Sequence, residues 1–167
     1  MSEAHALFQL GMDLGAQHRD QRPSTAQTED NIEINTGVTS SDTRYDHFIV
    51  KNGVRCAGTH LIIDLLDGEG LDNLELMESV LRDCVTEAGA TLLHIHLHHF
   101  TPNGGISGVA VLAESHISVH SWPENGFAAF DVFMCGDAKP EVCVEILRKA
   151  FNAKRVVVSE HLRGRGA

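Results

Sequence analysis

The strongest constraint on the fold of this chain is a succession of four short strand-like runs with only turn-length segments between them. The runs are "TLLHIHLHHF" (91–100), "SGVAVLA" (107–113), "HISVHSW" (116–122) and "FAAFDVFMC" (127–135). Parallel strands need a crossover connection of a dozen or more residues, and these connections are too short for one. The runs therefore predict a mainly antiparallel sheet.

Two amphipathic helices are expected beside this sheet. The first follows the strand-like run "THLIIDLLD" (59–67), with Asp72 predicted as its cap, Glu75 completing a capping box, and Gly89 as its stop. Its apolar residues recur at helical spacing, namely Met77, Val80, Leu81, Cys84, Val85 and Ala88. The second helix follows Pro140, and "KRVVVSEH" (154–161) is expected to be the last strand.

These elements predict an α+β fold, a two-layer sandwich with both helices on one face of the sheet. The other face carries several small or polar residues, and the chain has no third layer to cover it. We therefore expect the sheets of two subunits to pack face to face in a homodimer.

The N-terminal third has a different character. Residues 1–56 are expected to form a polar arm, partly mobile, ahead of a single domain at 57–167. Residues 19–46 are rich in Ser and Thr and show neither helical nor strand periodicity. Short apolar clusters at 6–10 and 47–50 are candidates for docking onto the domain.

Charge and cysteine usage exclude several classes of function. A net charge of -10 over 167 residues argues against a nucleic-acid partner and suits a cationic or amine-bearing ligand. No apolar run approaches the ~20 residues that cross a bilayer, and the N-terminus does not resemble a signal peptide. The four cysteines form no C-x-x-C pair. A cytoplasmic protein with reduced thiols and no membrane partner is expected.

Reactive side chains gather in "AESHISVHSWPE" (113–124). On a strand, His116, Ser118, His120 and Trp122 share one face, while Ile117 and Val119 face the other way. A zinc site on the alternating His94, His96 and His98 is one interpretation, although no H-E-x-x-H or C-x-x-C motif accompanies the row. A hydrolase using Ser115 with His116 or His120 is another, but the G-x-S-x-G motif is missing.

A more specific interpretation comes from a resemblance. "ESHISVHSWPE" (114–124), with "FDVFMCG" (130–136) and Ser107 in "PNGGISG" (102–108), closely resembles the short prokaryotic S-adenosylmethionine decarboxylase proenzymes. The resemblance runs from about residue 57 to the C-terminal "EHLRGRG" (160–166). Such proenzymes make their own pyruvoyl cofactor, and no metal is implied.

The resemblance implies roles for the reactive residues. Ser115 attacks the carbonyl carbon of Glu114, and the chain is cleaved between these residues to leave a pyruvoyl group derived from Ser115. Ser107 steadies the oxyanion of the first step, and His120 is the base for the elimination that follows. The pyruvoyl group then forms a Schiff base with the amine of the substrate, and Cys135 returns the proton after carbon dioxide leaves.

The resemblance also implies a substrate site. Phe100 and Trp122 surround the purine, Glu124 binds the ribose hydroxyls, and Ile117 and Val119 supply apolar pocket contacts. Simpler interpretations exist: Ser107 as a turn residue, His120 as a surface residue, Cys135 as an inert thiol, Trp122 as a plug and Glu124 as a solvated charge.

The expected activity is decarboxylation of S-adenosylmethionine, which gives the aminopropyl donor for spermidine biosynthesis. A homodimer of cleaved protomers, with pocket residues from both chains around each pyruvoyl group, is expected to carry it out. The alternatives are a pyruvoyl-dependent decarboxylase of arginine or ornithine, and an uncleaved regulatory or binding homologue.

Overall fold

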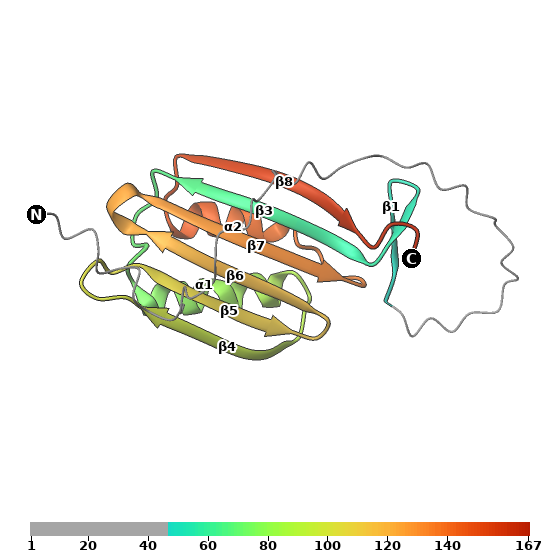
Figure 1. Cartoon of the computed structure of the whole chain (residues 1–167), viewed down its shortest axis with the longest axis horizontal. Coiled ribbons are helices and arrows are strands. Elements are labelled where there is room, and N and C mark those ends of the chain that lie inside the picture. Colours follow the sequence, from blue (N-terminus) through green and yellow to red (C-terminus); the bar gives the residue numbers. More distant parts are fainter. Residues whose placement is uncertain (1–46) are drawn as a thin grey trace, which may run out of the picture. The chain divides into compact units, whose positions relative to one another are not determined.

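One antiparallel sheet of six strands dominates the computed structural model, which describes residues 47–167 (Figure 1). The strand order is β4-β5-β6-β7-β3-β8. The bounds are β3 (Gly58–Leu66), β4 (Leu92–His99), β5 (Ile106–Leu112), β6 (Ser115–Trp122), β7 (Phe127–Cys135) and β8 (Arg155–Arg163). The predicted antiparallel sheet is confirmed. The predictions for residues 1–46, including the cluster at 6–10, lie outside the described residues.

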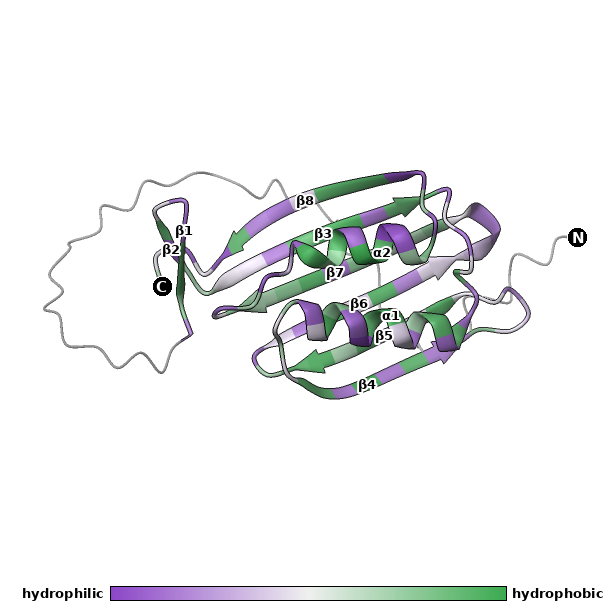
Figure 2. Ribbon diagram, turned by 180° about the vertical axis from the view of Figure 1, so that it is seen from behind, coloured by the Kyte–Doolittle hydropathy of each residue, from purple (hydrophilic) through white to green (hydrophobic). Residues whose placement is uncertain are grey.

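Both helices, α1 (Leu74–Glu87) and α2 (Val142–Ala150), lie on the same face of the sheet (Figure 2). The predicted apolar stripe of α1 is buried, and Gly89 adopts the left-handed conformation expected just past a helix end. The predicted cap is wrong by one residue. Asn73, not Asp72, precedes the helix, and its side chain accepts a 3.0 Å hydrogen bond from the amide of Leu76.

The hydrophobic core lies between the helices and the sheet. Alternate residues of each central strand point into it, as the two-residue period of a strand requires. On β7 these are Ala128, Phe130, Val132 and Met134, and on β6 they include Ile117 and Val119. The α+β two-layer sandwich is therefore confirmed. Neither helix in residues 47–167 is long and apolar enough to cross a membrane.

A small hairpin precedes the main sheet and was not predicted. β1 (Ile49–Lys51) and β2 (Val54–Cys56) pair with each other around Asn52 and Gly53, which both have positive φ angles. Asn-Gly is the strongest short hairpin signal in a sequence, so the signal was present within the expected polar arm. Lys51 forms an ion pair with Glu160 of β8.

The open face is the side of the sheet that the helices do not cover. It carries the intervening residues of every strand, including His60, Ile62 and Asp64 of β3 and Phe133 and Cys135 of β7. Several of its apolar side chains are exposed, among them Ile62, Val111, Trp122 and Val157.

The pairing of β4 with β5 depends on a close backbone approach at Gly108. A Cβ atom at this position would overlap the carbonyl oxygen of His96 and the side chain of Leu97. We predict that Gly108→Ala lowers the free energy of unfolding by about 1–3 kcal/mol, because the two strands must move apart. Urea unfolding measures this change. Val109→Ile, which adds a methylene on the open face next to Gly108, should change stability by less than about 0.5 kcal/mol. Equal effects of the two variants would contradict the argument.

Candidate active site

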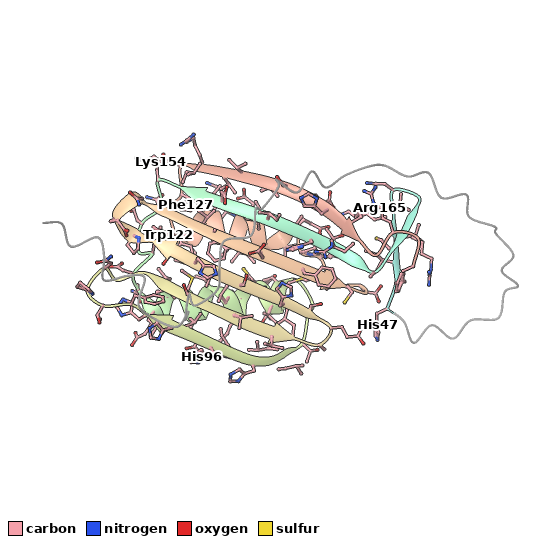
Figure 3. The ribbon with its side chains drawn as sticks, viewed as in Figure 1. His47, His96, Trp122, Phe127, Lys154 and Arg165 are labelled. Atoms are coloured by element: carbon pink, nitrogen blue, oxygen red, sulfur yellow. The ribbon has the colours of Figure 1, made fainter. Side chains whose placement is uncertain are left out.

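The open face gathers most of the reactive side chains of the sheet. Ser107, His116, His120 and Cys135 lie on this face of β5, β6 and β7, which are neighbours in the sheet, and Ser115 begins β6 at the end next to Cys135. Figure 3 shows Trp122 and Phe127 beside each other at one end of this sheet and His47 near the other end. The predicted residues fall into two groups, one toward each end of β6.

The first group surrounds the peptide bond between Glu114 and Ser115. This bond follows the two-residue turn that joins β5 to β6, and Glu114 has a φ of 60°. Left-handed backbone is unfavourable for a residue with a side chain and is usually taken by Gly, Asn or Asp. Strain of order 1–3 kcal/mol is therefore stored next to the bond.

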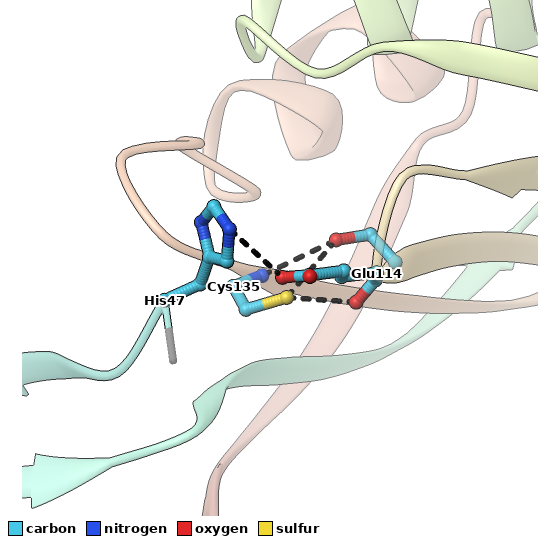
Figure 4. Close-up of polar contacts among 4 residues, drawn as sticks. His47, Glu114 and Cys135 are labelled. Carbon is cyan, nitrogen blue, oxygen red and sulfur yellow. Dashed lines mark hydrogen bonds and ion pairs between the residues drawn. The ribbon is translucent and has the colours of Figure 1, made fainter. Parts of the chain in front are cut away.

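Cys135 holds both residues of this bond (Figure 4). Its thiol donates a 2.7 Å hydrogen bond to the carbonyl oxygen of Glu114. Its backbone amide donates to Ser115 Oγ at 3.3 Å, and Sγ lies 3.5 Å from the same oxygen. The serine hydroxyl and the carbonyl beside it are thus positioned by one residue of the neighbouring strand.

Cys135 differs from the other cysteines of the domain. Cys56, Cys84 and Cys143 are buried, whereas Cys135 is only half-buried. The pKa of the Cys84 thiol is raised far above its ordinary value, mainly by a hydrogen bond with Cys143 and secondly by burial. This thiol therefore stays protonated. Among the described cysteines, Cys135 is therefore the one placed for chemistry.

His47 also contacts the turn that carries Glu114. His47 Nε2 lies 3.5 Å from Glu114 Oε2 (Figure 4). The carbonyl oxygen of His47 accepts a 3.0 Å hydrogen bond from the amide of Gly136. These two contacts hold His47, which precedes β1, beside the turn that carries Glu114.

The second group contains Ser107 and His120, which are directly paired across β5 and β6. Ser107 Oγ lies 2.8 Å from His120 Nδ1. The imidazole can act as a base at Nε2 only if Nδ1 carries the hydrogen, in which case Nδ1 donates to Ser107. The serine hydroxyl then keeps its own hydrogen for another acceptor.

The two groups do not meet within one protomer. Ser115 and His120 are five residues apart on one extended strand, which corresponds to about 17 Å. A side chain of His120 cannot reach the hydroxyl of Ser115 in its own chain. The structure thus brings together Ser115 with Cys135, and Ser107 with His120, but keeps the pairs apart.

Aromatic side chains lie at the His120 end. Trp122 is 41% exposed and stacks on Phe127, with ring centroids 5.2 Å apart. Glu124 is exposed in the short 3-10 turn η2 (Pro123–Asn125) that follows Trp122. Phe100, at the end of β4, is 46% exposed and packs edge to face on His98. Phe127 was missed, although its place just after the tight turn from Trp122 could have revealed it.

The predicted pocket roles of Ile117 and Val119 are wrong. Both side chains have no exposed surface and lie in the core beneath the helices. The two-residue period of β6 sends these odd-numbered positions to the face opposite His116 and His120. Their side chains cannot contact a ligand on the open face.

A polar chain that was also missed crosses the open face near Ser115. Arg163 Nη1 lies 3.0 Å from His60 Nδ1, and His60 Nε2 lies 3.4 Å from Asp131 Oδ1. Ser118 donates a 3.2 Å hydrogen bond to the other oxygen of Asp131. A pocket of about 490 Å³ opens beside this chain, and its lining residues are Leu112, Glu114, Ser115, His116, Phe133 and Arg163.

The row of His94, His96 and His98 lies on β4, at the edge of the sheet. All three side chains are exposed. In residues 47–167, no three His, Cys, Asp or Glu side chains are arranged to hold a metal ion.

Comparisons with known proteins agree with this geometry. Residues 59–164 match a family model described as S-adenosylmethionine decarboxylase. An S-adenosylmethionine decarboxylase proenzyme of Thermotoga petrophila is 45% identical over 115 residues, which cover 67% of this chain and 88% of the relative. A proenzyme of the same name from Thermomicrobium roseum is 39% identical over 112 residues, covering 66% and 97%. The crystal structure of the adenosylmethionine decarboxylase from Aquifex aeolicus is similar with a TM-score of 0.61 and 35% identity, covering 65% of this chain and 92% of the other.

The largely buried imidazole of His60 predicts a dependence of stability on pH. Burial lowers the pKa of His60 below its ordinary value near 6.5, whereas the nearby Asp131 works in the opposite direction. Arg163 and His116 also face this ring and lower its pKa further, and His161 is its partner on β8. Below pH 6.5 the unfolded chain therefore binds a proton at this site more readily than the folded chain.

We expect the free energy of unfolding to fall as the pH drops from 7.5 through 6.5 to 5.5, and to fall less steeply in His60→Asn. Urea unfolding at several pH values measures the slope. His161→Asn, which removes an exposed histidine opposite His60, should retain the slope of the wild type. An unchanged slope in His60→Asn would show that this ring does not carry the effect.

Proposed function

Because this chain belongs to the S-adenosylmethionine decarboxylase family, we propose that it decarboxylates S-adenosylmethionine with a pyruvoyl group made from its own Ser115. The product is the aminopropyl donor for spermidine biosynthesis. The observation that carries the proposal is the contact of one residue, Cys135, with both the hydroxyl of Ser115 and the carbonyl of Glu114.

The residues present fit the generation of a pyruvoyl group at position 115. A serine hydroxyl is placed next to a strained peptide bond, and the carbonyl of that bond accepts a hydrogen bond from a thiol. The group itself supplies an electron-accepting carbonyl for the decarboxylation of an amino acid. Ser115, with Cys135 and the wall of the neighbouring pocket, would surround it.

The first step of processing is an N-to-O acyl shift. Ser115 Oγ bonds to the carbonyl carbon of Glu114, the carbon–nitrogen bond breaks, and an ester with a free Ser115 amine remains. Negative charge develops on the carbonyl oxygen of Glu114 before the bond breaks. The thiol hydrogen of Cys135 already points at this oxygen, and the hydroxyl of Ser107 from a second subunit is proposed as a second donor, because Ser107 lies beside His120 at the far end of β6.

The second step is an elimination. His120 removes the Cα proton of Ser115, the Cβ–Oγ bond breaks, and Glu114 leaves as a carboxylate. Addition of water and loss of ammonia from residue 115 complete the conversion. The hydrogen bond between His120 and Ser107 supports this role, because it can fix the imidazole with Nε2 free to accept a proton.

A second subunit is proposed to bring His120 to Ser115. The two lie about 17 Å apart on β6, so His120 can act on Ser115 only across an interface. If two open faces pack around a two-fold axis near the middle of β6, the Ser115 end of each strand meets the His120 end of the other. Two equivalent sites then form together, and the exposed apolar side chains of the open face become buried.

In the decarboxylation itself, Cys135 is proposed to return a proton to the substrate carbon. Its thiol is half-buried and lies beside residue 115. The substrate purine would stack against Trp122, whose contact with Phe127 fixes its ring, with Phe100 as the second aromatic wall. Glu124 would accept hydrogen bonds from the ribose hydroxyls.

Replacement of Ser115 tests the origin of the activity. We predict that Ser115→Ala remains a single chain of full mass and releases no carbon dioxide from S-adenosylmethionine, because no hydroxyl is available for the acyl shift. Cys135→Ala should still be cleaved, more slowly than the wild type, and should lose most of its turnover. Intact-mass analysis and release of labelled carbon dioxide measure both properties. Ser79→Ala, an exposed serine of α1, is the matched control. Cleavage of Ser115→Ala between residues 114 and 115 would refute the proposal.

A mixture of two inactive variants tests the shared site. Ser115→Ala lacks the nucleophile and His120→Ala lacks the base, so neither should be cleaved alone. In a mixed dimer, one site contains Ser115 from the His120→Ala chain and His120 from the other chain. We predict that co-expression with distinct tags gives cleavage of the His120→Ala chain only. The double variant Ser115→Ala/His120→Ala, co-expressed with His120→Ala, should give none. An uncleaved mixture of the two single variants would exclude a site built from both chains.

A further inference from the structure

The pocket beside Ser115 contains one side chain that is always positively charged. Among its lining residues, Glu114 is acidic, His116 is an imidazole, and only Arg163 carries a permanent positive charge. Arg163 is the last residue of β8, at the edge of the sheet opposite Gly58 of β3. None of the roles proposed above uses this guanidinium group.

The contact between Arg163 and His60 fixes the tautomer of the His60 ring and makes Arg163 the donor. A guanidinium can only donate hydrogen bonds, so His60 Nδ1, at 3.0 Å, must carry the lone pair. The ring hydrogen of the neutral imidazole then lies on Nε2, the atom that faces Asp131. Nε2 is buried, and within residues 47–167 it has no partner other than this carboxylate at ion-pair distance. In this hydrogen-bonded series, His60 therefore presents its ring hydrogen to Asp131 and accepts a hydrogen bond from Arg163. The guanidinium of Arg163 ends the series in the wall of the pocket.

This arrangement leaves the charge of Arg163 available. Within residues 47–167, no carboxylate forms an ion pair with Arg163, and its defined partner is a neutral ring. An arginine held in this way keeps its attraction for an anion, whereas an arginine paired with Asp or Glu loses most of it. The geometry points to an anionic group of the ligand at this wall of the pocket.

We propose that Arg163 binds the α-carboxylate of the substrate, with His60 and Asp131 as positioning residues. This inference rests on the proposed function, which requires the substrate amine to react at residue 115. The carboxylate is attached to the same carbon as that amine, so it must lie in the part of the pocket next to Ser115. Arg163 is the cation there, and the sulfonium group would be directed away from it by charge repulsion.

The contact has a consequence for the catalytic cycle. Loss of carbon dioxide removes the carboxylate that Arg163 binds. The product therefore cannot form the charge-assisted hydrogen bond that the substrate makes with Arg163. Arg163 thereby favours the amino acid over the decarboxylated amine. It also fixes the direction of the bond that breaks, since the carboxylate is held at a defined wall.

Arg163→Gln tests this proposal by comparing substrate with product. The decarboxylated product differs from S-adenosylmethionine at the carboxylate that Arg163 is proposed to bind. We expect the variant to be cleaved completely, as seen by intact mass. Its KM for S-adenosylmethionine should rise roughly tenfold to a hundredfold with a smaller change in kcat. Its Kd for the decarboxylated product, measured by calorimetry on the cleaved enzyme, should stay within about twofold of the wild type.

Matched variants complete the experiment. Arg165→Gln removes an exposed arginine that does not line the pocket and should keep the wild-type KM (Figure 3). His60→Asn keeps an acceptor near the position of Nδ1 and should raise KM less than His60→Leu, which removes it. If Arg163→Gln does not fold, Arg163→Lys gives a weaker form of the comparison: it keeps the charge and loses the forked geometry, so KM should rise by less while the product Kd stays unchanged.

The outcomes separate the possibilities. An equal rise in KM and in the product Kd would mean that Arg163 only shapes the pocket, and an unchanged KM would mean that it does not bind the carboxylate. Failure of Arg163→Gln to cleave would assign it to processing instead. Each of these results overturns the proposal while leaving the decarboxylase function intact. Absence of carbon dioxide release by the wild type would overturn the proposed function and the carboxylate site together.

Discussion

The register of β6 against its two neighbours is the interaction on which the rest of the site depends. Pairing with β5 places Ser107 opposite His120, and pairing with β7 places Asp131 opposite Ser118 and Phe127 opposite Trp122. The same pairing brings Cys135 beside the turn that carries Glu114. A shift of β6 by one residue would send Ser118, His120 and Trp122 to the other face of the sheet, away from these partners. The backbone hydrogen bonds of three strands therefore position the reactive groups.

Much of the fold could be predicted because its signals are local. The short connections between strands are compatible only with antiparallel pairing. The helical spacing of the apolar residues in α1 identified its buried face. The cap of α1 was wrong by one residue because Asp72 and Asn73 are both good capping residues, and only the packed structure decides between them. The hairpin at 49–56 was overlooked despite its Asn-Gly turn, because the two strands are three residues each and lie beside a polar segment.

The candidate site was predicted in part, and its errors have a physical cause. Ile117 and Val119 were assigned to the pocket by resemblance, although the alternation of β6 sends both to the core. His60 and Arg163 are 103 residues apart and meet only because β8 pairs with β3 at the edge of the sheet. The order of strands in a sheet is not contained in any local pattern. A contact that depends on this order, such as the one between His60 and Arg163, therefore cannot be predicted from the sequence alone.

The position of the Glu114–Ser115 bond has a consequence for folding. It lies in the turn of the β5–β6 hairpin, so a cut there leaves β5 and β6 on separate polypeptides joined only by their ladder of hydrogen bonds. Before the cut, the two strands find each other at the small entropic cost of closing a two-residue loop. Afterwards their association is bimolecular, and it depends on concentration. Self-processing in this hairpin would make the mature fold a state that is reached through the precursor and is not easily recovered once its fragments separate.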